Sequence, residues 1–135
     1  MSDDEYKLAL IQHHFERACI TLRDAQNLHK TEGSPVSIVN RSYYAMFYAA
    51  LALLASVDQE ASKHTGVLSL FNEMFIKTKI LPMEMSKMLR KAFDVRQTGD
   101  YEDNANVDME QAIQILRFAE RFIQTAEEKL STELH

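Results

Sequence analysis

The last quarter of the chain carries an apolar repeat that is typical of one long helix. Between positions 109 and 130 an apolar residue recurs at alternating steps of three and four. The repeat consists of Met109, Ala112, Leu116, Ala119, Ile123, Ala126 and Leu130. Steps of this size keep side chains on a single face of an α-helix. The segment before Lys30 shows the same spacing and starts with Ser2 and Glu5, a capping-box pair, so we expect a long helix at each end of the sequence.

A second helix is expected directly after the first. Ser34 followed by Pro35 is typical of an N-cap and a first helical residue, so this helix should run from there to about Ser56. It is apolar almost all the way round. We therefore expect it to be the central helix, enclosed by its neighbours.

The middle of the chain completes a helical bundle. Apolar spacing predicts a third helix over residues 65–77 and a fourth over residues 82–96, followed by a polar loop around Gly99 from 97 to 107. Only three glycines and two prolines occur in the 135 residues, fewer than the turns of a β-sandwich or barrel need. We expect an all-α, up-and-down bundle of about five helices that forms a single domain over residues 1–135.

Composition limits where the protein works and what it binds. Cys19 is the single cysteine, so no internal disulfide is possible, and this favours a reducing, cytoplasmic compartment. No apolar run approaches the roughly 20 residues of a membrane helix, and the acidic N-terminus is unlike a secretion signal. The net charge of −5 disfavours nucleic acid, but residues 30–96 carry nine Lys or Arg against six Asp or Glu. The middle of the chain is therefore basic and its ends are acidic.

The second helix contains a cation that needs a partner. Asn40 and Arg41 interrupt its apolar sequence, and helical spacing places Tyr44 and Tyr48 on the same face as Arg41. One interpretation is an anion site, because a guanidinium offers a fixed set of donors to a phosphate and tyrosines add hydroxyl groups and stacking surface. The other, which the residues alone favour, is a structural arginine paired with a core carboxylate.

A second polar cluster ends the predicted fourth helix. Arg96, Asp100 and Tyr101 occur around Gly99, which permits a backbone turn. Asp100 is a candidate partner for Arg41 or Arg96, and a turn residue that bonds its own backbone is the simpler interpretation. The carboxylates that follow lack the spacing of a calcium loop, so we interpret them as solvated charges and helix caps and expect no metal or cofactor. They are Glu102, Asp103 and Asp108.

Among the histidines, His64 is the best candidate for a proton-transfer group. It is the only histidine in the basic middle of the chain, just before the third predicted helix. A helix-start residue without a chemical role is the simpler interpretation. His13, His14 and His29 belong to the first helix, where we expect them at the surface.

The chain resembles the HEPN domain family at three segments. They are Asn40-Arg41-Ser42-Tyr43-Tyr44-Ala45-Met46-Phe47-Tyr48, Lys63-His64-Thr65-Gly66 and Arg96-Gln97-Thr98-Gly99-Asp100-Tyr101. The resemblance covers nearly the whole chain. Within the family, the chain is most similar to the small single-domain prokaryotic members. It implies an all-helical bundle, a homodimer, and a minimal nucleotidyltransferase as the partner in a toxin–antitoxin pair.

The resemblance also implies a place for catalysis. Many HEPN proteins are metal-independent ribonucleases whose motif is an arginine followed after four to six residues by a histidine, in a composite site across a dimer. Arg41 matches the arginine, whereas Met46, Phe47 and Tyr48 occupy the positions of the histidine. Some HEPN toxins are silenced by adenylylation of a tyrosine near the motif, which here implies Tyr48 or Tyr44.

Three functional hypotheses follow. The leading one is a dimeric module that binds RNA or a nucleotide phosphate and works with a nucleotidyltransferase. Its binding residues would be Asn40, Arg41, Tyr44, Tyr48, Arg96, Asp100 and Tyr101. The second hypothesis is a metal-independent ribonuclease toxin in which Arg41 holds the scissile phosphate and His64 or Tyr48 transfers protons. The third is a purely structural interaction domain in which Arg41 is only a buried tether.

Overall fold

The computed structural model describes residues 2–101 and 107–134, with side chains for 2–98 and 107–134. Its helices are α1 (Asp3–Lys30), α2 (Pro35–Ser56), α3 (His64–Phe71), the short π-helix η1 (Asn72–Ile76), α4 (Met83–Tyr101) and α5 (Met109–Leu134). No strand occurs among the described residues, and the predicted all-α bundle is confirmed. None of the described helices is long and apolar enough to cross a membrane.

Local caps and a close contact define the hairpin of α1 and α2. Ser2 and Ser34 each accept a hydrogen bond from the backbone N–H three residues later, at 3.2 and 3.1 Å, so both predicted N-caps are confirmed. Gly33 follows α1, and its N–H donates to the Leu28 carbonyl at 2.6 Å. A Cβ atom at Gly33 would lie 2.9 Å from Leu28 Cδ2. This turn therefore requires a residue without a side chain.

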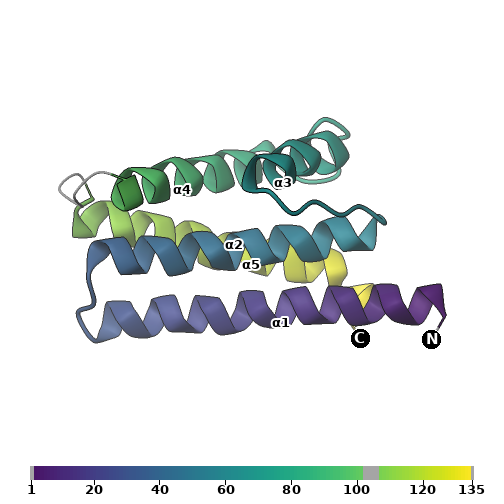
Figure 1. Ribbon diagram of the computed structural model, residues 1–135, viewed down its shortest axis with the longest axis horizontal. Coiled ribbons are helices and arrows are strands. Elements are labelled where there is room, and N and C mark those ends of the chain that lie inside the picture. The colour runs from purple at the N-terminus through teal and green to yellow at the C-terminus, as the bar shows by residue number, and fades with distance from the viewer. Residues whose placement is uncertain (1, 102–106, 135) are drawn as a thin grey trace.

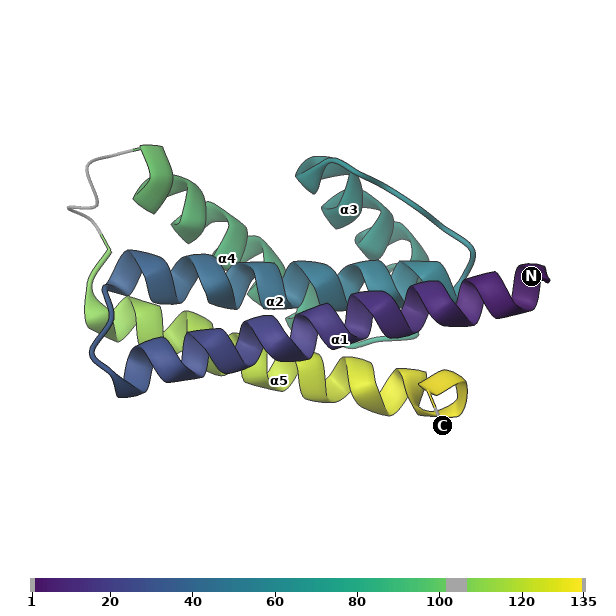
Figure 2. The same cartoon turned by 60° about the horizontal axis from the view of Figure 1, so that its bottom comes forward.

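Helix α2 is the centre of the bundle, as predicted. It contacts α1, α3, α4 and α5. Figures 1 and 2 show α1 and α5 along one side of it, with α3 and α4 on the other. The apolar side chains of α2 that have no exposed surface are Ile38, Tyr43, Ala45, Met46, Ala49, Ala50, Ala52, Leu53 and Leu54. The few half-exposed side chains of α2 are therefore unusual and locate the candidate site.

The third helical segment differs from the prediction in its backbone. Spacing predicted one α-helix over 65–77, whereas α3 ends at Phe71 and a π-helical turn follows, closed by a 2.9 Å bond from the Lys77 N–H to the Asn72 carbonyl. A single π-turn changes the apolar spacing by less than one residue, so periodicity does not reveal it. Both aromatic rings still reach the core, where the centroid of Phe71 lies 5.7 Å from Phe75 and 5.6 Å from Phe122 of α5.

The predicted loop after Arg96 is wrong over its first part, because α4 extends to Tyr101. Thr98 lies in this extension, and its hydroxyl donates to the Asp94 carbonyl at 3.2 Å, one helical turn earlier. A glycine inside a helix costs only about 1 kcal/mol relative to alanine. Gly99 therefore does not end the helix, and the predicted backbone turn at this position is not present.

Candidate functional site

One face of α2 carries half-exposed aromatic side chains with arginines lying against them. Arg41, Tyr44 and Tyr48 follow one another at helical spacing, and each is half-buried. The guanidinium carbon of Arg41 lies 5.4 Å from the centre of the Tyr44 ring, and that of Arg96, from α4, lies 5.2 Å from the same ring. Arg96 also lies 5.6 Å from the centre of the Tyr43 ring. Cations from two helices thus share one tyrosine.

A third arginine, Arg17 of α1, joins this row, and the sequence interpretation missed it. Its Nη2 atom donates to the Tyr48 hydroxyl at 2.9 Å, and its guanidinium carbon lies 4.1 Å from the centre of the Tyr48 ring. The sequence contained a signal for this contact, because a tight hairpin centred between Glu32 and Gly33 pairs Arg17 with Tyr48. We call the following residues the arginine–tyrosine cluster: Arg17, Arg41, Arg96, Tyr43, Tyr44 and Tyr48.

Arg41 has an amide partner, and no carboxylate of the described part pairs with it. Its Nε and Nη2 atoms donate to Asn40 Oδ1 at 3.1 and 2.8 Å. Among the described residues no carboxylate forms an ion pair with Arg41, so the core carboxylate of the structural alternative is not found there. The guanidinium keeps its positive charge and also has N–H groups that Asn40 does not use.

His64 begins α3 and faces the same cluster. Its Nδ1 atom lies 2.7 Å from the hydroxyl oxygen of Tyr43, and its ring centroid lies 5.7 Å from Tyr44 and 4.7 Å from Phe47. Burial, together with the charge of Arg96, lowers the pKa of His64 below its usual 6.5, and burial raises the pKa of Tyr43. Both groups are therefore uncharged at neutral pH. The fold brings His64 and Arg41 to the same Tyr44 ring, as a joint role for them would require.

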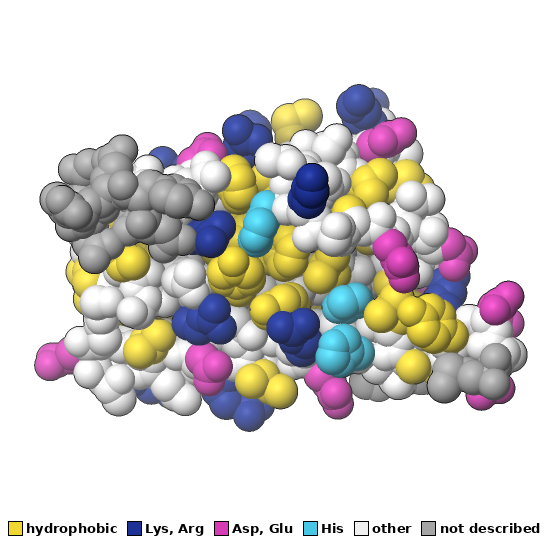
Figure 3. All heavy atoms as spheres, in the orientation of Figure 1, with side chains coloured by type: hydrophobic (Ala, Val, Ile, Leu, Met, Phe, Trp, Pro, Cys, Tyr) yellow, Lys and Arg dark blue, Asp and Glu magenta, His cyan; other side chains and the backbone are white. Residues whose placement is uncertain are grey.

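The face that carries this cluster is basic and aromatic. Figure 3 shows Lys, Arg and His side chains around a group of hydrophobic side chains in the middle of the molecule, over α1, α2 and α3. Basic groups gather here in a chain whose net charge is −5. The local charge therefore differs in sign from the net charge.

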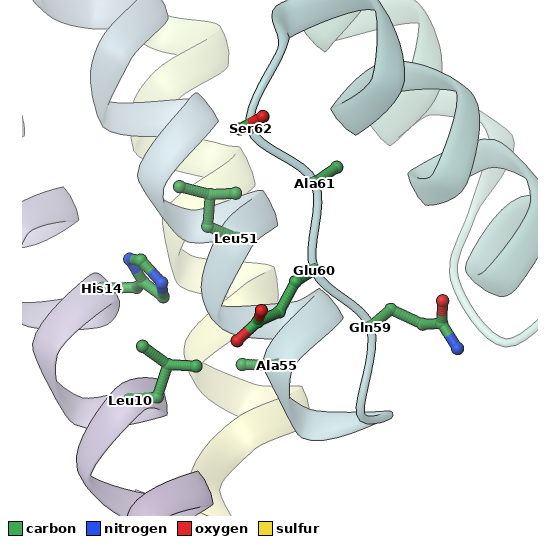
Figure 4. A pocket seen from close by; sticks show the side chains of 8 residues that line it. All are labelled: Leu10, His14, Leu51, Ala55, Gln59, Glu60, Ala61 and Ser62. Carbon is green, nitrogen blue, oxygen red and sulfur yellow. The ribbon is translucent and has the colours of Figure 1, made fainter.

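A pocket lies beside the cluster, between α1, α2 and the segment that leads to α3 (Figure 4). It has a volume of about 340 Å³ and is lined by Leu10, His14, Leu51, Ala55, Gln59, Glu60, Ala61 and Ser62. Of the three histidines predicted at the surface, His13 is exposed, whereas His14 and His29 are half-buried. The Nδ1 of His14 has no hydrogen-bond partner in the structure as described. Burial lowers the pKa of His14, and the charges of His13 and Arg17 lower it further, while Glu60 opposes them.

Two predicted site residues fall outside the described side chains. Asp100 and Tyr101 belong to the last turn of α4, but their side chains lie outside the described part, and so do Glu102 and Asp103. Asp108 accepts a backbone N–H at the start of α5 at 2.8 Å, which confirms its interpretation as a helix cap. Within residues 2–98 and 107–134, no three His, Cys, Asp or Glu side chains are grouped as metal ligands.

Comparisons with known proteins point to one family. A family model described as HEPN domain matches residues 11–129. A UPF0332 protein of Thermotoga maritima is 40% identical over 128 residues, which cover 95% of this chain and 96% of that protein. A protein of Methanocaldococcus jannaschii named "Putative toxin MJ0142" is 35% identical over 108 residues, which cover 80% of this chain and 73% of that protein. A UPF0332 protein of Archaeoglobus fulgidus is 38% identical over 85 residues, which cover 63% of this chain and 67% of that protein.

Proposed function

Since this chain belongs to the HEPN domain family, we propose that it binds RNA or a nucleotide phosphate at the arginine–tyrosine cluster. We propose further that it acts as a homodimer and as the partner of a minimal nucleotidyltransferase in a toxin–antitoxin module. The name of the Methanocaldococcus relative, "Putative toxin MJ0142", supports such a module. The observation that carries the binding proposal is the convergence of Arg17, Arg41 and Arg96, from three helices, on adjacent tyrosine rings.

The cluster suits a phosphate because two of its cations are held in place without being neutralised. Arg17 and Arg41 each lie against a tyrosine ring, and neither forms an ion pair among the described residues. A guanidinium that lies against a ring keeps the N–H groups along its edge, and these fit two phosphate oxygens. Salt screens the attraction between these arginines and a phosphate, and the rest of this acidic protein repels the phosphate. Binding should therefore depend strongly on the salt concentration.

The tyrosines supply a second kind of contact. Tyr44 and Tyr48 are half-exposed, and their ring centroids lie 6.0 Å apart. Ring surface that the arginines leave uncovered can stack on bases, which contributes about 1–3 kcal/mol per base in single-strand binding proteins. Such stacking tolerates any base, so the cluster by itself should bind RNA with little sequence preference.

A single-stranded RNA of about 12 nucleotides tests the binding proposal in a titration at several salt concentrations with excess EDTA. We expect Arg41→Ala to weaken binding about tenfold at low salt and to reduce the slope of log affinity against log salt by about 0.7, the value for one phosphate contact to a single strand. Arg23→Ala is the matched control, because Arg23 is an exposed arginine of α1 outside the cluster. Equal affinities for the parent protein and a folded Arg41→Ala variant would overturn the proposal.

The partnership makes a separate prediction. With ATP and the cognate nucleotidyltransferase, the Tyr48 hydroxyl oxygen would bond to the α-phosphorus while pyrophosphate leaves and the hydroxyl proton goes to solvent. Intact mass spectrometry should then detect one added adenylyl group, which Tyr48→Phe abolishes. An unchanged mass of the parent chain counts against this modification.

A second candidate function, a metal-independent ribonuclease, is favoured by the 2.7 Å contact between Tyr43 and His64 beside the cluster. Cleavage requires a base that removes the proton of a ribose 2′-hydroxyl while its oxygen bonds to phosphorus, and an acid that protonates the departing 5′-oxygen. His64 is uncharged at neutral pH because burial and Arg96 lower its pKa, so it can accept that proton. Arg41 would hold the phosphate whose charge increases in the transition state.

Incubation with total RNA in excess EDTA distinguishes the two functions. Cleavage by the parent protein that is lost in both Arg41→Ala and His64→Gln, but retained in His29→Gln, would support the ribonuclease. His29 is the control because it lies at the end of α1, away from α3. Intact RNA with every variant would leave binding without cleavage as the function.

A further inference from the structure

The face of the arginine–tyrosine cluster continues along α1 and α2 beyond Tyr48. The two helices run antiparallel (Figure 1), and Arg17 contacts Tyr48. Ten residues farther from the turn on each side, Lys7 Nζ of α1 lies 3.5 Å from Oδ2 of Asp58, just past the end of α2. The pocket of Figure 4 lies between these two contacts. Its helical walls are Leu10 and His14 of α1 and Leu51 and Ala55 of α2. Because these positions follow Arg17 and Tyr48 at helical spacing, the pocket and the cluster belong to one continuous surface.

The pocket combines apolar walls with two polar groups that converge. Figure 4 shows the carboxylate of Glu60 and the imidazole of His14 directed toward the space beside Leu10 and Leu51, while the Gln59 amide points away. The Nδ1 of His14 is buried and lacks a partner among the residues described. Apolar walls with a few convergent polar groups are typical of small-molecule sites.

The chemistry of Glu60 limits what the pocket can accept. A carboxylate only accepts hydrogen bonds, so the ligand group that faces it must present N–H donors. Among nucleobases, guanine presents adjacent imino and amino N–H groups that match the two oxygens of one carboxylate, whereas uracil presents a single N–H. A volume of about 340 Å³ accommodates a purine.

The distance from the pocket to Arg41 determines the length of a strand that contacts both. Arg17 is closer to the pocket, one helical turn from His14, whereas Arg41 and Leu51 are ten residues apart on α2, or about 15 Å at the helical rise per residue. A stacked strand advances about 3.4 Å per nucleotide, so a phosphate at Arg41 and a base beside Leu51 would be about four nucleotide steps apart, which needs a strand of about five nucleotides. A single nucleotide is too short to occupy both positions.

We infer that this pocket is a guanine subsite and that a single-stranded RNA that contacts both the pocket and Arg41 is at least about five nucleotides long. The inference rests on the proposed function, because it assumes that the cluster binds RNA phosphates. It adds a base preference and a minimum length, which the cluster alone does not supply.

Calorimetric titration of the parent protein with UUUUU, GUUUU, UUUUG and GMP, at low salt in EDTA, tests the inference. We expect the pentanucleotide whose guanine reaches the pocket to bind about tenfold more tightly than UUUUU, the discrimination that one good bidentate base contact supplies, and GMP, which cannot also reach Arg41, to bind more weakly than either. Glu60→Gln should remove the guanine preference without weakening UUUUU binding. Glu128→Gln changes the same charge at an exposed position of α5 and should keep the preference.

The outcomes separate this inference from the proposed function. UUUUU binding that is weakened in Arg41→Ala, with no preference of the parent protein for either guanine-containing strand, would overturn the guanine subsite and leave the proposed function in place. GMP binding as tight as that of the pentanucleotides would overturn the minimum length. No binding of any strand by the parent protein would overturn the proposed function, and this inference with it.

Discussion

The hydroxyl oxygen of Tyr43 and the Nδ1 atom of His64 lie 2.7 Å apart, although 21 positions separate the two residues. Tyr43 is fully buried on the central helix, and His64 is the first residue of α3. Their hydrogen bond therefore joins the start of a short helix to the core. It also lies beside Arg96, whose charge disfavours protonation of His64 and lowers the pKa of the histidine further than burial alone.

Acidification should destabilise the protein through His64. Burial first, and then Arg96, lower the pKa of His64 in the folded state below 6.5. The unfolded chain therefore binds this proton more readily, so the contribution of His64 to stability is complete above pH 6.5 and is lost as the pH falls from there toward the folded pKa. Urea unfolding above and below pH 6.5 should show a smaller pH dependence for His64→Gln than for the parent protein. An identical pH dependence in both would contradict this.

Removal of the Arg96 charge should raise the pKa of His64. The repulsion between Arg96 and a protonated imidazole would be absent in Arg96→Gln, while the burial that lowers the pKa would remain. NMR titration of the His64 ring should thus give a pKa between that of the parent protein and 6.5. Arg90→Gln is the control, because Arg90 pairs with Asp94 on the exposed side of α4. An unchanged His64 titration in Arg96→Gln would show that the charge does not act on it.

Two glycine substitutions should change stability in opposite directions. A Cβ atom at Gly33 would lie 2.9 Å from Leu28 Cδ2 and 3.0 Å from the Leu28 carbonyl oxygen, so Gly33→Ala should cost about 1–3 kcal/mol, as overpacking does. At Gly66, inside α3, the nearest atom would be Ala61 Cβ at 3.7 Å. Gly66→Ala should therefore add about 0.5–1 kcal/mol, because alanine is the better helix former. Urea denaturation of both variants provides the measurement. A loss of stability in both would show that the space available to a Cβ atom does not decide the effect.

The aromatic contact between α3, η1 and α5 should carry much of the stability. Phe71, Phe75 and Phe122 have no exposed surface, and Phe122→Ala should cost about 3–5 kcal/mol. That is a large part of the roughly 5–15 kcal/mol that stabilises a typical domain. Ile20→Ala is the control, since Ile20 is 56% exposed and should change the free energy of unfolding by less than about 0.5 kcal/mol. Equal midpoints for the two variants in urea would contradict the packing described for this core.

Helix boundaries were predictable wherever one local signal defined them. Ser2 and Ser34 determine where α1 and α2 begin through hydrogen bonds to neighbouring residues, and Pro35 contributes through its fixed φ at the first helical position. The prediction was wrong at the π-turn after Phe71 and at the end of α4. At the π-turn the apolar spacing is nearly unchanged, and at the end of α4 a glycine inside a helix costs only about 1 kcal/mol, so local signals do not decide the backbone at either place.

The all-α fold, the central position of α2 and the shared face of Arg41, Tyr44 and Tyr48 follow from the order of residues alone, because helical periodicity places these residues without reference to distant ones. Which groups those side chains meet depends on tertiary packing. It brought Arg17 to Tyr48, His64 to Tyr43 and Arg96 to Tyr44. Each of these contacts joins two helices, so it depends on how the helices pack and on which side chains meet between them, and local spacing within one helix does not contain that information.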